Sequence, residues 1–190
     1  GRNFRVDSEG NIIFGLNAIK HVGQKAADHI KEQRAASDDW GSLPEFLLAI
    51  DLHVVNRKAL ECLIKSGACS SLEGSRRQQY DGLDDILKYA QGVQAGIDSH
   101  QESLFGGHDA LSAPPPLPEV APWAEQEQFD MEKELTGYFL SGHPLNIFDA
   151  DLKEFSNYDF IDPQQGLKLE QLRLGGLVTQ LKHHSTKAGL

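Results

Sequence analysis

A short basic turn near the start of the chain has residue types that suit phosphate binding. Lys20-His21-Val22-Gly23 interrupts a stretch of apolar residues at helical spacing, and Lys25 follows it. Glycine permits a tight turn, and the helix after it begins with backbone N–H groups that have no partner within the helix. These donors and the positive end of the helix dipole suit a phosphate oxygen, and both lysines add attraction. We therefore predict that these five residues contact a phosphate backbone.

The outline of this turn is that of a helix-hairpin-helix, with one departure. The motif usually has a second glycine where His21 stands, so a helix pair that serves only for packing remains an alternative. A second unit of this kind is predicted from residues 43–50 and 56–64, and its loop has no glycine, which favours a structural role. Two such units commonly pack as a four-helix domain against the minor groove of duplex DNA, where they contact backbone and are indifferent to sequence.

Two further basic pairs are candidates for phosphate contact. Arg57 and Lys58 open the second predicted helix of the second unit, and Arg76 and Arg77 open a later helix. Helix ends that are merely solvated are the alternative for both pairs.

A protein-binding motif is predicted in the middle of the chain. Residues 99–123 hold Gly106 and Gly107 together with five prolines, which indicates an extended linker. Within it, the run Gln101-Glu102-Ser103-Leu104-Phe105 places two large apolar side chains in polar surroundings. Burial of each in a partner pocket is worth about 1.5–3 kcal/mol, and the amide of Gln101 can fix orientation by hydrogen bonds.

The charge of the chain is unevenly distributed. The sequence has 18 Lys and Arg against 28 Asp and Glu, a net charge of −10 that taken alone disfavours polyanion binding. Residues 98–162 hold 14 of the acids and only 2 bases, whereas residues 1–97 hold 13 acids and 12 bases. The region expected to meet DNA is therefore nearly neutral. The sequence has no apolar run of membrane-spanning length and no signal peptide, so we expect a cytoplasmic protein without a membrane partner, and an excised piece of a longer chain.

Catalysis and metal binding find little support in the sequence. Cys62 and Cys69 fit no paired metal spacing, and we expect both to be reduced and buried. The eight histidines form no ligand motif, and the acidic pairs lack phosphate-binding elements around them. We expect no catalytic residue, no metal site and no cofactor in this segment; a metal-dependent nuclease would require turnover on addition of metal. Five acids are expected on a solvated helix face: Glu125, Glu127, Asp130, Glu132 and Glu134.

The periodicity predicts a mainly α fold. Helices are expected over 43–50, 56–65, 76–91 and 124–139, with Asn56 as an N-cap and Gly67 as a stop. The last of these helices is expected to end at Ser-Gly-His-Pro, because Pro144 cannot continue it, and His143 is expected to be a turn residue after it. Leucines alternate in residues 167–184, which predicts the first strand of a β domain.

Several stretches together resemble one known family. IIFGLNAIKHVGQKAADHI, VNRKALECLIKSGACSSL, QESLF and EKELTGYFLSGHPL occur in the order and spacing of the C-terminal half of the alpha subunit of bacterial DNA polymerase III. The resemblance implies five regions: a tandem helix-hairpin-helix domain that binds DNA (1–73), a connecting helix (74–98), a linker with a clamp-binding motif (99–122), a helical connection (123–165) and the start of a truncated OB-fold (166–190).

The resemblance also implies partners and an activity. Gln101, Ser103, Leu104 and Phe105 would bind the sliding clamp, the beta subunit, and other subunits of the polymerase III holoenzyme would be partners. The parent protein would be a DNA-directed DNA polymerase whose catalytic residues and Mg²⁺ lie in domains outside this segment. The alternative is a helical protein-interaction adaptor without nucleic-acid binding.

Overall fold

The computed structural model describes residues 4–37, 39–99, 113–157 and 171–182. The chain divides into two compact units, Gly1–Ser141 and Gly142–Leu190.

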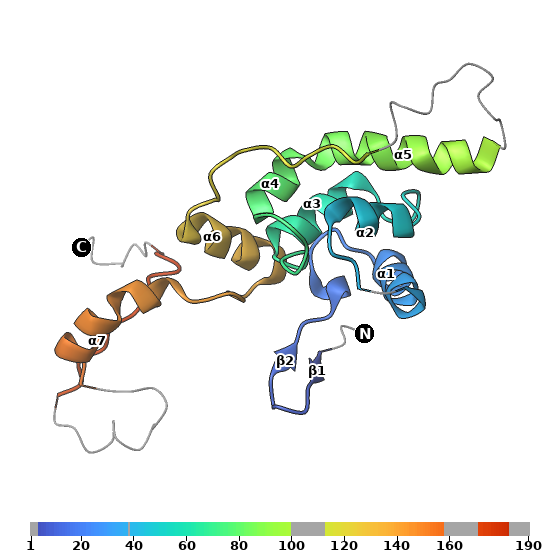
Figure 1. The fold of residues 1–190 in the computed structure, drawn as a ribbon. Coiled ribbons are helices and arrows are strands. Elements are labelled where there is room, and N and C mark those ends of the chain that lie inside the picture. Colours follow the sequence, from blue (N-terminus) through green and yellow to red (C-terminus); the bar gives the residue numbers. More distant parts are fainter. Residues whose placement is uncertain (1–3, 38, 100–112, 158–170, 183–190) are drawn as a thin grey trace. The chain divides into compact units, whose positions relative to one another are not determined.

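The first unit is mainly helical, as the sequence predicts (Figure 1). A two-stranded antiparallel hairpin opens it, with Arg5 opposite Ile13 and Val6 opposite Ile12. The elements follow in this order: β1 (Arg5–Val6), β2 (Ile12–Ile13), the 3₁₀ turn η1 (Leu16–Ala18), α1 (Gln24–Ala36), α2 (Leu43–Ala49), α3 (Arg57–Lys65), α4 (Arg76–Asp81), α5 (Leu83–Ser99) and α6 (Glu125–Thr136).

Side-chain caps explain where several of these helices begin. The side chain of Asn56 accepts a hydrogen bond from the backbone N–H of Ala59 at 2.9 Å, which confirms Asn56 as the N-cap of α3. Ser75 and Gln78 form a reciprocal capping box at the start of α4. After α3 the chain reverses at Gly67, whose φ of +82° is accessible to glycine without strain, so the predicted stop is confirmed.

Three predicted helices differ in extent from those in the structure. The apolar residues at helical spacing before the basic turn form only the three-residue η1. The helix predicted over 76–91 is two helices, because Gly82 interrupts it and caps α4. The α6 helix ends at Gly137, which has a left-handed φ of +86°, and not at Ser-Gly-His-Pro. Gly82 and Gly137 thus each end a helix, although the apolar periodicity continues beyond them.

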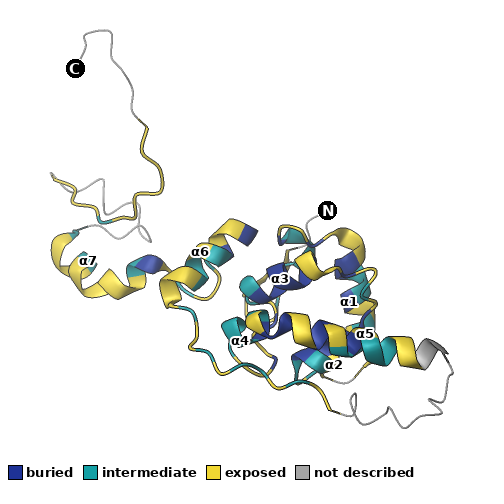
Figure 2. Cartoon of the chain, turned by 90° about the horizontal axis from the view of Figure 1, so that it is seen from above, coloured by how far each residue is buried: buried dark blue, intermediate teal, exposed yellow. Residues whose placement is uncertain are grey.

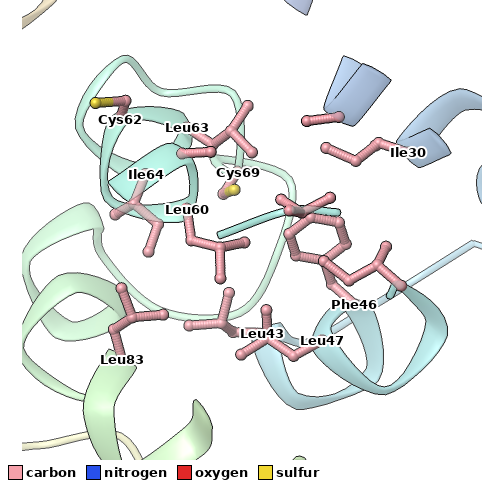
Figure 3. Packing of buried hydrophobic residues seen from close by; sticks show 14 of the residues in the cluster. Ile30, Leu43, Phe46, Leu47, Leu60, Cys62, Leu63, Ile64, Cys69 and Leu83 are labelled. Atoms are coloured by element: carbon pink, nitrogen blue, oxygen red, sulfur yellow. The ribbon is translucent and has the colours of Figure 1, made fainter. Parts of the chain in front are cut away.

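The core of the first unit is formed mainly by α1, α2, α3 and α5, and the turn before α1 and Leu135 of α6 also contribute to it (Figure 2). Figure 3 shows Leu43 and Leu47 of α2 facing Leu60 of α3 and Leu83 of α5. Full burial of each such side chain is worth about 1.5–3 kcal/mol, so this cluster holds the three helices together.

Both cysteines are buried free thiols, as predicted. They lie on different sides of α3 in Figure 3, with Cys69 directed toward the leucine cluster. Burial raises the pKa of Cys69 to about 12 and also raises the pKa of Cys62. Both therefore remain protonated thiols near neutral pH.

The described part of the predicted linker, residues 113–122, is extended and attached to α4. Leu117 packs against the core, and the side chain of Gln78 donates a hydrogen bond to the carbonyl of Pro118 at 3.1 Å. The ring of Trp123 then lies 5.6 Å from that of Tyr80. This portion of the chain therefore follows the helical unit closely before α6 begins.

The second unit contains the 3₁₀ turn η3 (Pro144–Phe148) and α7 (Asp149–Phe155). His143 caps η3 by accepting a hydrogen bond from the N–H of Leu145, which confirms it as a turn residue. The predicted first strand is not formed in residues 171–182. A strand requires a ladder of backbone hydrogen bonds, and within the described residues this segment bonds only with Asn157, through Gln171 and Arg173.

No helix in the described ranges is long and apolar enough to cross a lipid bilayer.

Candidate nucleic-acid interface

The basic turn, residues 19–25, is called the first hairpin here. His21 occupies it with a φ of +65°, the left-handed conformation that a glycine would adopt without cost. The structure therefore places the demand for positive φ on His21. Gly23, by contrast, has φ −71° and ψ 162°, which any residue can adopt, so the expectation that the turn depends on the freedom of Gly23 is wrong.

The side chains of the first hairpin divide between surface and core. Lys20, His21, Gly23 and Lys25 are exposed, whereas Val22 is buried with only 4% of its surface accessible. Val22 therefore anchors the turn to the core and can contact a ligand only through its backbone.

The N-terminus of α1 is open to an approaching group. Its N-cap, Gly23, supplies no side-chain oxygen, and the first turn has no acidic residue. A Cβ built on Gly23 would meet no atom within 4 Å. The first N–H groups of α1 thus lack the side-chain acceptor that caps α3, and the position where Gly23 would carry a Cβ is open.

The lysines of the first hairpin keep their charge available. Within the described ranges neither Lys20 nor Lys25 lies in an ion pair. Their ammonium groups and the positive end of α1 therefore form a small cationic surface.

The second hairpin, residues 50–58, has its cations paired. Arg57 donates two hydrogen bonds to Asp84, at 2.8 and 3.1 Å, and one to Glu61 at 2.5 Å. The hydrogen bond from Arg57 to Asp84 raises the pKa of the arginine and lowers that of the carboxyl. Lys58 lies 3.5 Å from Glu61. The structure thus places Arg57 and Lys58 in ion pairs with acids.

Arg76 lies largely inside the protein. Its Nη1 is 2.7 Å from the carboxylate of Glu132, and the two side chains are 12% and 0% exposed. The guanidinium fills the space beside Gly67, where a Cβ would lie 2.4 Å from Nη2. Arg76 is therefore a structural residue, and the interpretation of it as a phosphate contact is wrong. Arg77 pairs with Asp81 on the surface.

Glu132 is the residue that the sequence interpretation placed wrongly. It is not on a solvated face: its carboxylate accepts hydrogen bonds from Arg76 and from the backbone N–H groups of Leu140 and Ser141, at 2.7 and 2.9 Å. The spacing of Phe129, Glu132 and Leu135 is the signal that could have found it, since residues three apart share a helix face. An acid between two apolar residues of one face needs a buried cation.

The ionisation of Glu132 is favoured despite its burial. Desolvation alone would raise its pKa, but the donors from Ser141, Leu140 and Arg76 outweigh it and hold the pKa of Glu132 below its ordinary value. The carboxylate is therefore charged at neutral pH and holds the loop 137–141 against α6.

The α6 helix is joined directly to the first hairpin. The backbone N–H of Lys20 donates to the carbonyl of Leu135 at 2.8 Å, and Leu135 is buried in the same core as Val22. A carbonyl in the last turn of a helix has no partner within that helix, so the hairpin satisfies it. The segment 124–141, named the α6 segment here, is thus part of the same packed unit as the turn.

Two further expectations concern the predicted clamp-binding residues and the absence of a metal site. Gln101, Ser103, Leu104 and Phe105 lie outside the described residues. Among the residues that are described, no group of three or more His, Cys, Asp or Glu side chains could hold a metal ion.

The chain matches one protein family in its N-terminal residues and a set of related proteins along nearly its whole length. Residues 1–79 match the family described as helix-hairpin-helix motif. The whole chain is similar to proteins named DNA polymerase III subunit alpha. It is 30% identical to that of Borreliella burgdorferi over 192 residues, 33% to that of Deinococcus radiodurans over 198, and 32% to that of Thermus aquaticus over 196. The predicted resemblance is confirmed.

These matches cover 98–100% of this chain but only 15–16% of the length of each relative. The chain therefore spans about a sixth of the length of these relatives, and its first 79 residues carry the helix-hairpin-helix match.

Proposed function

We propose that this chain is a non-catalytic part of a replicative DNA polymerase III alpha subunit that binds duplex DNA backbone and the sliding clamp. The parent protein is a DNA-directed DNA polymerase of the cytoplasm, with Mg²⁺ in a catalytic domain elsewhere and other holoenzyme subunits as partners. The contribution of this segment is mechanical, because a hold on the duplex and on the clamp raises the effective concentration of the primer end.

The DNA contact is supported above all by one observation, the available charge of the first hairpin. Lys20 and Lys25 are exposed, lack ion pairs among the described residues, and flank a helix N-terminus that has neither a side-chain cap nor an acid in its first turn. Phosphate oxygens suit all three features. Gly23 and His21 contribute exposed backbone at this surface. DNA contact by Arg57 and Lys58 stays a prediction, and their ion pairs with acids weaken the case for it.

The clamp contact rests on the run Gln101-Glu102-Ser103-Leu104-Phe105, which the resemblance to the polymerase III alpha family implies as the clamp-binding motif. A pull-down of the 190-residue chain with the cognate clamp tests it. We expect Leu104→Ala/Phe105→Ala to abolish capture, because burial of these two side chains supplies the affinity. Equal capture by the variant would exclude this assignment.

The DNA contact is tested by titrating a short duplex with the same chain over a range of salt. We expect affinity that falls as salt rises and that weakens further in Lys20→Gln/Lys25→Gln. Affinity that is independent of salt and of these two lysines would overturn the DNA proposal.

A second candidate function is a helical adaptor that binds only proteins. The pairing of Arg57 and Arg76 with acids favours it, because these cations are unavailable to a polyanion. Absence of duplex binding at low salt together with retained clamp capture would support this candidate.

A further inference from the structure

The α6 segment connects two structural features that lie far apart in the sequence. One is the buried ion pair between Arg76 and Glu132, and the other is the hydrogen bond from the Lys20 N–H to the Leu135 carbonyl. Glu132 and Leu135 are three residues apart in α6, so both contacts come from one helix turn.

The two contacts join α6 to different neighbours: the ion pair joins it to α4, and the hydrogen bond joins it to the first hairpin. Glu132 is fully buried and binds α4 through Arg76, while it also accepts the N–H groups of Leu140 and Ser141. These bonds hold the helix and the returning loop 137–141 in one register. Leu135, three residues further along the same turn, then presents its carbonyl to Lys20.

Among the described residues, the other backbone hydrogen bonds of the first hairpin outside α1 are local, and they include Ile19 donating to Leu16 and Ala27 donating to Gly23. The N–H of Val22 donates to Ile19, and His21 adopts a left-handed conformation that an L-residue holds only when its surroundings impose it. The amide of Lys20 directly precedes His21. Its bond to Leu135 therefore fixes the entry to the strained position.

We infer that Glu132 is a positioning residue for the first hairpin: it holds Leu135 where the carbonyl can bind Lys20, and so sets the geometry in which the turn meets a phosphate backbone. This inference rests on the proposed DNA contact. It assigns the α6 segment to the DNA-binding surface, although none of its side chains is itself a candidate contact.

The test uses the 190-residue chain with Glu132→Gln, which keeps the size of the side chain and removes its charge. We expect the Lys20 amide to lose protection from hydrogen exchange while amides of α2 and α5 keep theirs. Duplex affinity should fall about tenfold, the loss that one charge-assisted hydrogen bond gives. In the Glu132→Gln background, Lys20→Gln/Lys25→Gln should cost less than it does in the unaltered chain, because the two sets of residues act together.

Two controls separate positioning from a general loss of stability. Glu125→Gln makes the same charge change at an exposed position of α6, and Ile86→Val trims the core in α5; neither should lower duplex affinity or Lys20 protection in the folded chain. If Glu132→Gln does not fold, Arg76→Lys weakens the same pair while keeping its charges, and should give the same pattern more mildly.

The outcomes are distinguishable from failure of the proposed function. Full Lys20 protection and unchanged duplex affinity in a folded Glu132→Gln chain would overturn the inference. In that case the proposed DNA contact would still be tested separately by Lys20→Gln/Lys25→Gln. If the lysine variants bind DNA like the unaltered chain, the proposed function fails, and Lys20 protection alone still decides whether Glu132 positions the turn.

Discussion

The two hairpins of the helical unit carry similar basic residues in opposite circumstances. In the first, Lys20 and Lys25 flank the open N-terminus of α1 and make no ion pair in the described part of the chain. In the second, Arg57 is held by Asp84 and Glu61, and Lys58 shares Glu61. The difference teaches that a basic residue near a helix start is a phosphate site only when nearby acids leave its charge available.

A similar contrast separates the two arginine-carboxylate pairs. The pair of Arg76 and Glu132 is buried and supports the first hairpin, whereas that of Arg57 and Asp84 is exposed on both sides and belongs to the second. Exposed pairs contribute little because water and salt screen them.

The largest expected effect comes from removing one member of the buried pair. Glu132→Ala leaves the Arg76 guanidinium without its carboxylate and frees two backbone donors, so the free energy of unfolding should fall by about 3 kcal/mol. Urea denaturation measures the change. Asp84→Ala should leave the denaturation midpoint close to that of the unaltered chain, and equal destabilisation by the two variants would contradict the contrast between the pairs.

The buried pair also predicts a dependence of stability on pH. Because the folded state lowers the pKa of Glu132 below its unfolded value near 4.5, the stabilisation it gives is fully present above that value and is lost as pH falls through the folded pKa. Urea midpoints measured from pH 7 down to pH 3 should therefore decline less steeply in Glu132→Gln than in the unaltered chain. Parallel declines would show that Glu132 does not titrate differently on folding.

Backbone conformation in the first hairpin predicts a smaller effect. His21 bears a left-handed φ, so His21→Gly should raise the free energy of unfolding by about 0.5 kcal/mol, and His21→Val should lower it by about 1 kcal/mol. Gly23→Ala should change it less than either, since the φ of Gly23 is ordinary and the space around it is open. Thermal or urea unfolding of the three variants would reveal whether the strain is at His21 or at Gly23.

Much of the helical fold follows from the sequence because its signals are local. Asn56 and Gly67 mark the ends of α3 by capping chemistry that acts within one turn. The break at Gly82 and the stop at Gly137 were missed, since apolar periodicity continues across a glycine. The strand predicted around Gly175 depends on partners from elsewhere in a sheet, which a local pattern cannot supply.

The candidate site was predicted in part. The lysine and glycine pattern of residues 20–25 identifies an exposed turn, but pattern alone does not tell an available cation from a paired one. The ion pairs of Arg57 and Arg76 could not be predicted, because their partners Asp84 and Glu132 lie 27 and 56 residues away in sequence. Contacts over such separations depend on packing, so only the structure distinguishes the two hairpins.

The salt dependence of duplex binding tests the difference between the hairpins most directly. In Lys20→Gln/Lys25→Gln, the slope of log K against log salt should become shallower by about two, because two phosphate contacts no longer release counterions. In Arg57→Gln/Asp84→Asn, which removes one ion pair and leaves net charge unchanged, the slope should stay that of the unaltered chain. A slope that changes in the second variant and not in the first would contradict the assignment of DNA binding to the first hairpin.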